Sequence, residues 1–411
     1  MKRVLALLLC MALFLPALSL GESETEKDVD INELYEEDVE LDSEGNFILS
    51  GEEDGDFEFS DDDVAELEEA FEIDESVDPS ELYLNTNLPD DVINILLIGV
   101  DVKGTKSEKL LKEQGKYSKR ADVQMILSIN KTDGSIKLTS IARNTEVLIP
   151  GRKVKTLIAN SYGYAIYKND KYTGWVDTPY VCMGTVNQNF EMNIQYYVAV
   201  NFYGVVSIIE MLGGADVELT RKEASAINTY LSMRTIKNSE GKVVSHGKAI
   251  ANSYDDKGGK RDPLEKKDGV QHLDGLQALM YGRLRSIDDD FHRTGRTRKL
   301  LSALLTPTVA KIKNKELDVM KLLPECGRYF VTNMNPQAML EIVGYVMRSD
   351  AVKSMSLNDS LIEEFRIPID GTWKYATTDS GASVNRFVTG GKQENIEQLH
   401  TFIYGAYYPA D

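Results

Sequence analysis

The stretch "VINILLIGVD" at 92–101 is almost continuously apolar and ends in Gly99 and Asp101. A run with so little polar alternation is typical of a strand that is buried on both faces of an α/β sheet. Ligands usually bind at the carboxyl edge of such a sheet. Asp101, which follows the run at that edge, is therefore a candidate functional residue.

Two further β-rich runs, "ADVQMILSIN" and "SIKLTSIARN", flank "KTDG". The Asp133–Gly134 turn signal predicts that they form a hairpin. With these two residues as the turn, Arg143 would lie opposite Gln124, and Asp122 and Arg143 would share the open end of the hairpin. The pair has two interpretations, a functional constellation or a cross-strand salt bridge.

Helical and strand patterns alternate further along. "TVNQNF" predicts a helix, "QYYVAVNF" a strand, and "VVSIIEMLGG" a helix that its paired glycines end before the strand "DVEL". "LDGLQALMYGRLR" predicts a helix with Asp274 as N-cap and Gln277 three residues on, a variant of the capping box. This helix would bring Arg283 and Arg285 to its far end.

The segment "SIDDDFHRTGRTRKLLSALL" at 286–305 combines charge with an apolar helical stripe, which predicts a helix that begins near Arg293. Its start would contain four basic residues: Arg293, Arg296, Arg298 and Lys299. A helix N-terminus favours acids, so one interpretation is that an anion binds there and satisfies the arginines. Removing Arg296 would then weaken anion binding and leave the empty domain as stable. The other interpretation is that the aspartates at 288–290 pair with the arginines.

The charged residues are distributed unevenly along the chain of 411 residues, whose net charge is −20. Residues 1–21 combine Lys2 and Arg3 with an apolar run, which predicts a signal peptide or an N-terminal membrane anchor and an extracytoplasmic protein. Residues 21–80 contain 27 acidic residues and one Lys, so we predict an acidic, disordered linker at 22–84.

The folded domain is predicted at 85–411, with its motifs within 92–306 and a surface insertion at about 232–269, rich in Gly, Lys, Ser and Asp. Residues 81–411 contain 43 basic and 39 acidic residues, a net charge of +4. Export and this small charge argue against nucleic acid as a partner.

Candidate chemistry is limited by what the chain lacks. It contains no G-x-S-x-G, G-x-x-x-x-G-K-[ST], H-E-x-x-H or C-x-x-C motif. Cys182 and Cys326 follow the export signal, and we expect them to form a disulfide in an oxidising compartment. Carboxylates among many arginines suit a phosphate bridged by Mg2+. The candidates are Asp101, Asp122, Asp290, Arg120, Arg143, Arg283, Arg285, Arg293 and Arg296.

Six ordered blocks resemble the LytR-CpsA-Psr proteins of bacterial envelopes: "NILLIGVD", "RADVQMILSIN", "LTSIARNTEVLIPG", "YYVAVNFYGVVSIIEMLGGADVEL", "HLDGLQALMYGRLR" and "DDDFHRTGRTRKLLSAL". The resemblance implies an α/β/α sandwich around a central mixed β-sheet, with an apolar lipid-binding tunnel. It also implies an Mg2+-dependent glycopolymer phosphotransferase at the membrane, which moves a phosphate-linked glycan from polyprenyl (undecaprenyl) pyrophosphate to peptidoglycan. Pyrophosphatase activity is a further expectation. The alternative is a non-catalytic polyprenyl-phosphate-binding envelope regulator.

The resemblance also implies residue roles. Asp101 and Asp122 would hold Mg2+. The pyrophosphate would be bound by Arg120, Arg143, Arg283, Arg285, Arg293 and Arg296. The catalytic set would be Asp122, Arg143, Asp290, Arg293 and Arg296, with Asp122 or Asp290 as the candidate general base.

Three positions depart from the family pattern. The usual "SIPRD" is "SIARN" here, with Ala142 and Asn144, and Thr297 stands where Gln is common. The missing carboxylate at 144 raises the question of how Arg143 is held.

Overall fold

The computed structural model describes most of the chain after the acidic segment. The described residues are 80, 82–100, 120–168, 171–177, 179–231, 236–237, 243–244, 261–284, 287, 290–313, 325–327, 329–347, 362–378 and 381–410. Within them, no helix is both long and apolar enough to cross a membrane. The predicted signal or anchor at 1–21 and nearly all of the predicted linker lie outside the described residues.

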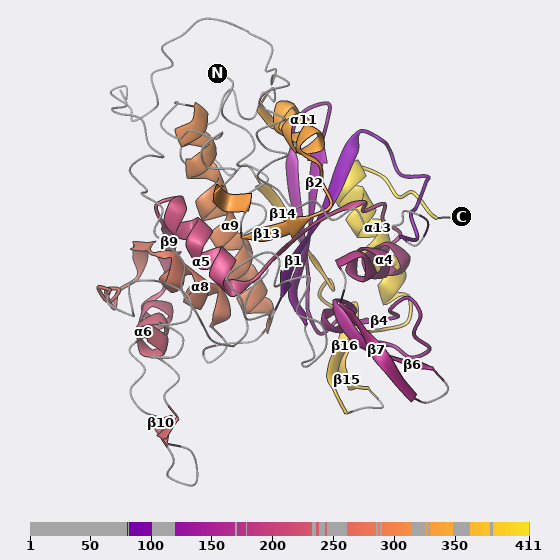
Figure 1. The fold of residues 1–411 in the computed structure, drawn as a ribbon, viewed down its shortest axis with the longest axis horizontal. Coiled ribbons are helices and arrows are strands. Elements are labelled where there is room, and N and C mark those ends of the chain that lie inside the picture. Colours follow the sequence, from indigo (N-terminus) through magenta and orange to yellow (C-terminus); the bar gives the residue numbers. More distant parts are fainter. Residues whose placement is uncertain are drawn as a thin grey trace, which may run out of the picture.

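A six-stranded mixed sheet forms the centre of the fold (Figure 1). Its strands, in spatial order, are β13 (Phe330–Thr332), β8 (Tyr196–Val200), β1 (Val92–Val100), β2 (Ala121–Asn130), β3 (Ile136–Ile141) and β14 (Ile362–Ile367). The pairs β1–β8 and β3–β14 are parallel, and the other neighbours are antiparallel. The predicted strand at 92–101 is therefore confirmed as a central strand.

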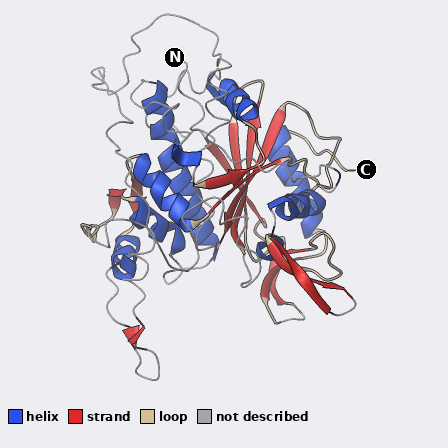
Figure 2. Cartoon of the chain, viewed as in Figure 1, coloured by secondary structure: helices blue, strands red, loops and turns tan. Residues whose placement is uncertain are grey.

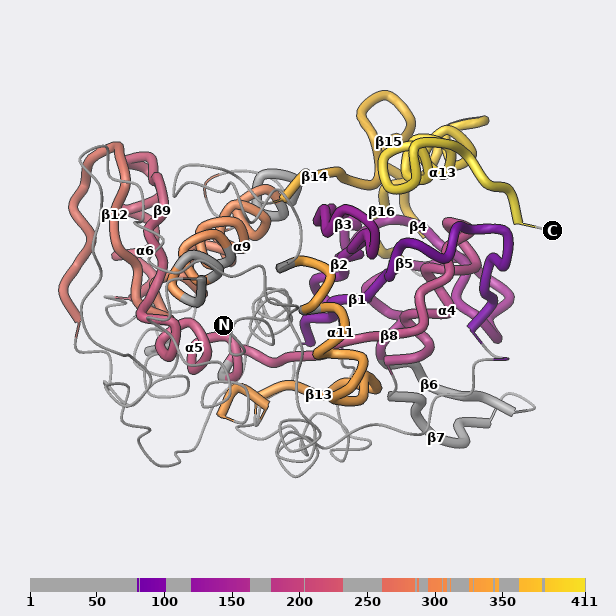
Figure 3. Tube along the Cα trace, turned by 90° about the horizontal axis from the view of Figure 1, so that it is seen from above, coloured from indigo at the N-terminus to yellow at the C-terminus, as the bar shows by residue number. Residues whose placement is uncertain are grey.

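Helices cover both faces of this sheet (Figure 2). One face packs against α5 (Phe202–Met211), α8 (Gly275–Arg283), α9 (Asp290–Lys313) and α11 (Pro336–Met347), with α6 (Arg221–Leu231) further out. The other face packs against α4 (Pro179–Phe190), α13 (Gly391–Tyr404) and the 3-10 helix η3 (Ile158–Ser161). Seen from above, the sheet lies between these two layers (Figure 3).

The β1 side chains explain the layering. Ile95 and Leu97 belong to the hydrophobic cluster on the α5 and α8 side, whereas Leu96 and Ile98 belong to the cluster on the α4 and α13 side. Because successive side chains of a strand point to opposite faces, an apolar run without alternation is buried on both sides. The α/β/α sandwich is confirmed, and the lipid-binding tunnel stays a prediction.

Five small two-stranded sheets surround the centre. They pair β4 (Glu146–Val147) with β5 (Thr156–Leu157), β6 (Gly163–Lys168) with β7 (Lys171–Asp177), β9 (Ala215–Leu219) with β12 (Gly269–Leu273), β10 (Ile236–Lys237) with β11 (Val243–Val244), and β15 (Trp373–Thr377) with β16 (Ser383–Phe387). The last of these packs against β4. Only short pieces of the predicted insertion at 232–269 lie within the described residues.

Local sequence signals correctly predict several boundaries of helices. Asp274 and Gln277 form both hydrogen bonds of a capping box at the start of α8. Gly213 and Gly214 follow α5 with positive φ, as expected of a helix end before β9. Leu82 is almost fully buried and its carbonyl accepts a hydrogen bond from Asn187, so the ordered body begins slightly before residue 85.

The predicted disulfide is wrong. Cys182 and Cys326 are both free and buried. Cys182, in α4, belongs to the cluster on one face of the central sheet, and Cys326 belongs to the cluster on the other face. Because the sheet separates the two thiols, they cannot come within bonding distance.

Candidate functional site

The candidate site lies at the edge of the sheet where β1 and β8 end. Parallel β1 and β8 place Gly99 beside Val200, and the antiparallel pairing of β1 with β2 brings the start of β2 to the same edge. The end of β3 also lies there, because β3 is antiparallel to β2. Asp122, near the start of β2, and Arg143, just after β3, therefore meet at the edge that the apolar run predicts.

A register shift in the β1–β2 ladder marks the position of Asp122. Gly99 pairs with Val123 and Val100 pairs with Ala121, which leaves Asp122 as an extra residue of β2. Such bulges re-aim a side chain at the end of a strand. The Asp122 carboxylate is almost fully buried, and its Oδ1 lies 2.8 Å from Nη1 of Arg143.

The hairpin register differs from the prediction by two residues. Gln124 pairs with Ile141, not with Arg143. The connecting loop has four residues, Lys131 to Gly134, because the Gly134 N–H donates to the Asn130 carbonyl and Gly134 has a φ of 66°. A shift of two residues keeps each side chain on its face, so the predicted proximity of Asp122 and Arg143 survives the error.

Backbone hydrogen bonds hold the Arg143 segment on both sides. The Ala142 N–H donates to the Ile367 carbonyl at the end of β14 (2.8 Å), and the Arg143 carbonyl accepts from the Ala159 N–H in η3 (3.2 Å). The Asn144 carbonyl accepts from the Asn385 N–H in β16 (2.8 Å). These bonds use the backbone, so the missing carboxylate at 144 does not leave Arg143 unsupported.

Arg283 reaches the same edge from α8. Its guanidinium carbon lies 4.7 Å from the centre of the Phe202 ring, a cation–π contact. Phe202 is the first residue of α5, directly after β8, and the Asn201 side chain caps that helix by accepting from the Gly204 N–H (2.9 Å). Arg283 thus lies at this edge, and its part in the site stays a prediction.

Arg296 is buried and has partners within the fold. Its side chain is 5 % exposed, it donates to the Leu284 carbonyl (2.6 Å), and it lies 3.5 Å from Oε1 of Glu223. The other carboxylate oxygen, Oε2, accepts from the N–H and hydroxyl of Thr220. The prediction that Arg296 is satisfied only by a bound anion is therefore wrong, because the fold itself supplies its partners.

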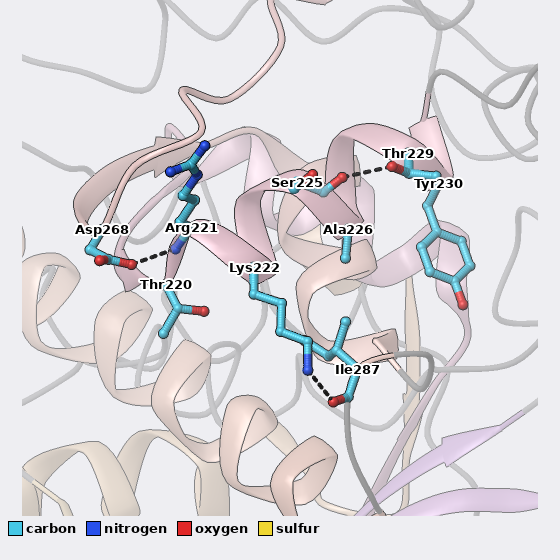
Figure 4. Close-up of a pocket in the computed structure, with 9 residues that line it drawn as sticks. All are labelled: Thr220, Arg221, Lys222, Ser225, Ala226, Thr229, Tyr230, Asp268 and Ile287. Carbon is cyan, nitrogen blue, oxygen red and sulfur yellow. Dashed lines mark hydrogen bonds between the residues drawn. The ribbon is translucent and has the colours of Figure 1, made fainter.

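The neighbouring Lys222 completes this attachment. Its Nζ donates to the Ile287 carbonyl (2.8 Å), so the first turn of α6 also holds the connection between α8 and α9 (Figure 4). The pocket drawn there has a volume of about 640 Å3 and is lined mainly by α6 residues. We assign these contacts to positioning of the α8 end, where Arg283 lies.

Two further basic residues of the charged segment, Arg298 and Lys299, have acidic partners. Arg298 donates to Glu364 of β14 (2.7 Å) and to Ser140 (2.6 Å), and Lys299 lies 3.3 Å from Oε2 of Glu218. For Arg298 and Lys299 the described partners are glutamates of other elements. The side chains of the aspartates at 288–290 lie outside the described residues, so their pairing with the arginines stays a prediction.

The start of α9 corrects the helix prediction as well. The helix begins at Asp290 and not near Arg293, so an acid occupies its first position, where the dipole favours it. The side chains of Asp290 and Arg293 lie outside the described residues, as do Asp101 and Arg285. Arg120 is exposed directly before β2.

Carboxylate chemistry at this edge fits a hard cation, since Mg2+ takes oxygen ligands and usually only one or two carboxylates. Asp122 supplies one such carboxylate. Among the described residues, no group of three or more His, Cys, Asp or Glu side chains is arranged to hold a metal. Asp101 lies outside the described residues, so this finding does not test it as a ligand.

A profile of the LytR_cpsA_psr family matches residues 60–386, which is most of the chain. The chain belongs to the LytR-CpsA-Psr family. A curated relative, the polyisoprenyl-teichoic acid–peptidoglycan teichoic acid transferase TagT of Bacillus subtilis, is 24% identical over 67% of this chain and 75% of its own length. The transferase TagU of Oceanobacillus iheyensis, with the same descriptive name, is 26% identical over 74% of this chain and 77% of its own.

Solved structures of LytR-CpsA-Psr proteins align with this chain as well. The structure described as TagT bound to LIIa-WTA is 18% identical, covers 80% of this chain and 94% of its own, and has a TM-score of 0.48. The crystal structure of Bacillus subtilis TagV is 20% identical, covers 78% of this chain and 100% of its own, and also has a TM-score of 0.48.

Several residues of this LytR-CpsA-Psr site were not predicted from the sequence. Phe202 under Arg283 and Glu223 beside Arg296 are the clearest cases. A signal for Glu223 exists, because Thr220 followed three residues later by Glu is a capping-box pattern. No comparable signal identifies Phe202 as a cation–π partner.

Proposed function

We propose that this protein transfers a phosphate-linked glycopolymer from a polyprenyl pyrophosphate carrier to peptidoglycan at the outer side of the cell membrane. The observation that carries the proposal is the buried Asp122–Arg143 pair at the carboxyl edge of β1, in a chain of the LytR-CpsA-Psr family. The names of the TagT and TagU relatives support the same donor and acceptor classes.

The reaction is a substitution at phosphorus. The oxygen of an acceptor sugar hydroxyl forms a bond to the phosphorus that carries the glycan, the bond from that phosphorus to the bridging oxygen breaks, and polyprenyl phosphate leaves with that oxygen. The hydroxyl proton passes to a base, for which Asp290 is the candidate. Such transfers depend mainly on positioning and charge stabilisation.

In this proposal the arginines bind the pyrophosphate. Arg143 is held by Asp122 and by the backbone of its segment, and Arg283 is held over Phe202. Guanidinium groups fixed in this way bind phosphate oxygens without a large ordering cost. Arg120, Arg285 and Arg293 complete the proposed set, whereas Arg296 acts by holding the end of α8.

Asp101 and Asp122 are the proposed ligands of Mg2+. When bound, the cation supplies positive charge that neutralises phosphate oxygens. Pyrophosphatase activity is a further proposal, in which water takes the place of the acceptor hydroxyl.

Transfer by the full-length chain tests this function. The donor is a polyprenyl pyrophosphate-linked glycan, the acceptor is peptidoglycan, and the products are polyprenyl phosphate and labelled peptidoglycan. We expect Arg283→Gln to lower kcat/KM by about tenfold to a hundredfold, the effect of losing one charge-assisted hydrogen bond. Lys299→Gln, which removes an exposed charge of α9, serves as the control.

A different result would reassign the protein. Donor binding without release of polyprenyl phosphate, with and without added Mg2+, would make it a non-catalytic polyprenyl-phosphate-binding regulator.

A further inference from the structure

A polar pocket adjoins the Arg143 segment at Glu146. It has a volume of about 410 Å3 and is lined by Glu146, Val154, Lys155, Asn189, Thr378, Arg386, Phe387 and Lys392. These residues come from β4, the loop before β5, α4, β15–β16 and the start of α13, which gather on one side of the fold (Figure 1). No residue of this pocket belongs to the site proposed above.

The pocket is close to that site along the chain. Glu146 follows Arg143 by three residues, and three residues of chain span at most about 10 Å. The two ends of this segment are both fixed, by Asp122 at Arg143 and by Arg386 at Glu146. We call this cavity the Lys155–Lys392 pocket.

The net charge of the pocket is positive. Arg386 binds the Glu146 carboxylate through two bonds, Nε to Oε2 and Nη2 to Oε1, each 2.7 Å long. Arg386 therefore neutralises the charge of the Glu146 carboxylate. Within the described part of the chain, neither Lys155 nor Lys392 forms an ion pair with a carboxylate.

The Lys392 ammonium lies in unfavourable surroundings, whereas Lys155 is exposed at the mouth of the pocket. Burial and the nearby Lys155 both lower the pKa of Lys392, and only Glu191 acts in the opposite direction. The Glu191 carboxylate is itself bonded to the Tyr407 hydroxyl (3.1 Å) and the Ala410 N–H (3.3 Å). Lys392 is the second residue of α13, where the helix dipole disfavours a cation.

An anion between the lysines would remove this repulsion. We propose that the Lys155–Lys392 pocket binds a phosphate group of the glycopolymer while the polymer's pyrophosphate end occupies the Arg143 site. The inference rests on the proposed function: the pocket adjoins the Arg143 segment at Glu146, and a polymer that carries phosphates along its length and is held at the Arg143 site could place one of them here. Phe387 and Val154 supply apolar surface for the adjoining sugar or polyol.

Calorimetry on the full-length chain tests the pocket directly. The probe is a short glycerol phosphate oligomer. The variant is Lys155→Gln with Lys392→Gln, and the control is Lys153→Gln with Lys374→Gln, which removes two exposed lysines that do not line the pocket. We expect the pocket variant to bind the oligomer about tenfold more weakly or worse, and the control to bind it as the parent chain does.

Two results would overturn the proposal. Equal affinity of the pocket variant and its control is one. The other is binding of a peptidoglycan fragment through its free carboxylates, with no binding of the oligomer, which would assign the pocket to the acceptor. The melting temperature of the pocket variant should be unchanged or higher, because repulsion is removed; a fall of several degrees would show that the lysines stabilise the fold instead.

Geranyl pyrophosphate separates this inference from the proposed function. It has no polymer, so the pocket variant should bind it with parental affinity, and a loss there would overturn the pocket as a separate subsite. If oligomer binding depends on the lysines but no transfer occurs, the proposed function fails and the pocket stands. If transfer occurs with the same KM in the pocket variant and its control, the pocket fails and the function stands.

Discussion

Replacing Arg296 tests whether the charged start of α9 is built for an anion or for the fold. We choose Arg296→Met because methionine keeps much of the apolar stem and removes the charge and the donors. The variant loses the 2.6 Å bond to the Leu284 carbonyl and the 3.5 Å ion pair with Glu223. Both partners stay in place, and Leu284 is fully buried.

The magnitude follows from these two contacts. A hydrogen bond from a charged group to a buried carbonyl contributes about 1.5–3 kcal/mol. The ion pair contributes about 1 kcal/mol, since its distance is long and the Glu223 side chain is 14% exposed. We therefore expect the free energy of unfolding to fall by about 3 kcal/mol, which corresponds to a melting temperature lower by roughly 4 °C for a folded body of this size.

The assay is thermal and urea unfolding of the chain without ligand, together with geranyl pyrophosphate binding. Lys299→Gln is the matched control, because it removes an exposed charge from the same helix. Affinity should fall in Arg296→Met as well, since the end of α8 that carries Arg283 loses its support. An unchanged or higher melting temperature with weaker ligand binding would refute this reasoning and restore the anion interpretation.

Three further results are expected. Asp122→Asn leaves the Arg143 charge without its carboxylate and should lower the free energy of unfolding by about 1–3 kcal/mol in urea, with a higher Mg2+ requirement for transfer; equal Mg2+ curves would exclude Asp122 as a ligand. Burial lowers the pKa of His400 below 6.5, and its ring bonds the Phe190 carbonyl, so stability should be full above pH 6.5 and fall as the pH drops below it; a His400→Gln variant with the same pH slope would contradict this. Thiol labelling in denaturant without reductant should find Cys182 and Cys326 both free, and a blocked pair would contradict the structure.

Local signals predicted the parts of the fold that are fixed over short stretches of chain. The apolar run at 92–101, the glycines after α5 and the Asp274 capping box each depend on residues within one element, so sequence alone identified them. The hairpin was predicted with the wrong register, because a two-residue and a four-residue loop share the same Asp133–Gly134 signal.

The parts of the fold and of the site that were not predicted depend on contacts between segments far apart in the sequence. Both edge strands of the central sheet, β13 and β14, come from beyond the predicted motif region at 92–306. The charge of Arg296 was visible in the sequence, but its partner Glu223 lies 73 positions earlier on another helix. A charged residue near a helix start therefore has the same sequence pattern whether it meets a ligand or a glutamate.

The segment from Ala142 to Glu146 contacts the C-terminal strands through its backbone, and its side chains belong to both the proposed site and the proposed pocket. β14 and β16, both from the last fifty residues, hold its backbone at Ala142 and Asn144. Its two charged side chains then point to separate partners, Arg143 to Asp122 and Glu146 to Arg386. Because the C-terminal strands supply these attachments, a part of the chain outside the six sequence blocks helps to determine where Arg143 lies. The spacing between the Arg143 site and the Lys155–Lys392 pocket is thus a property of the sheet itself, and ligand groups that occupy both must match it.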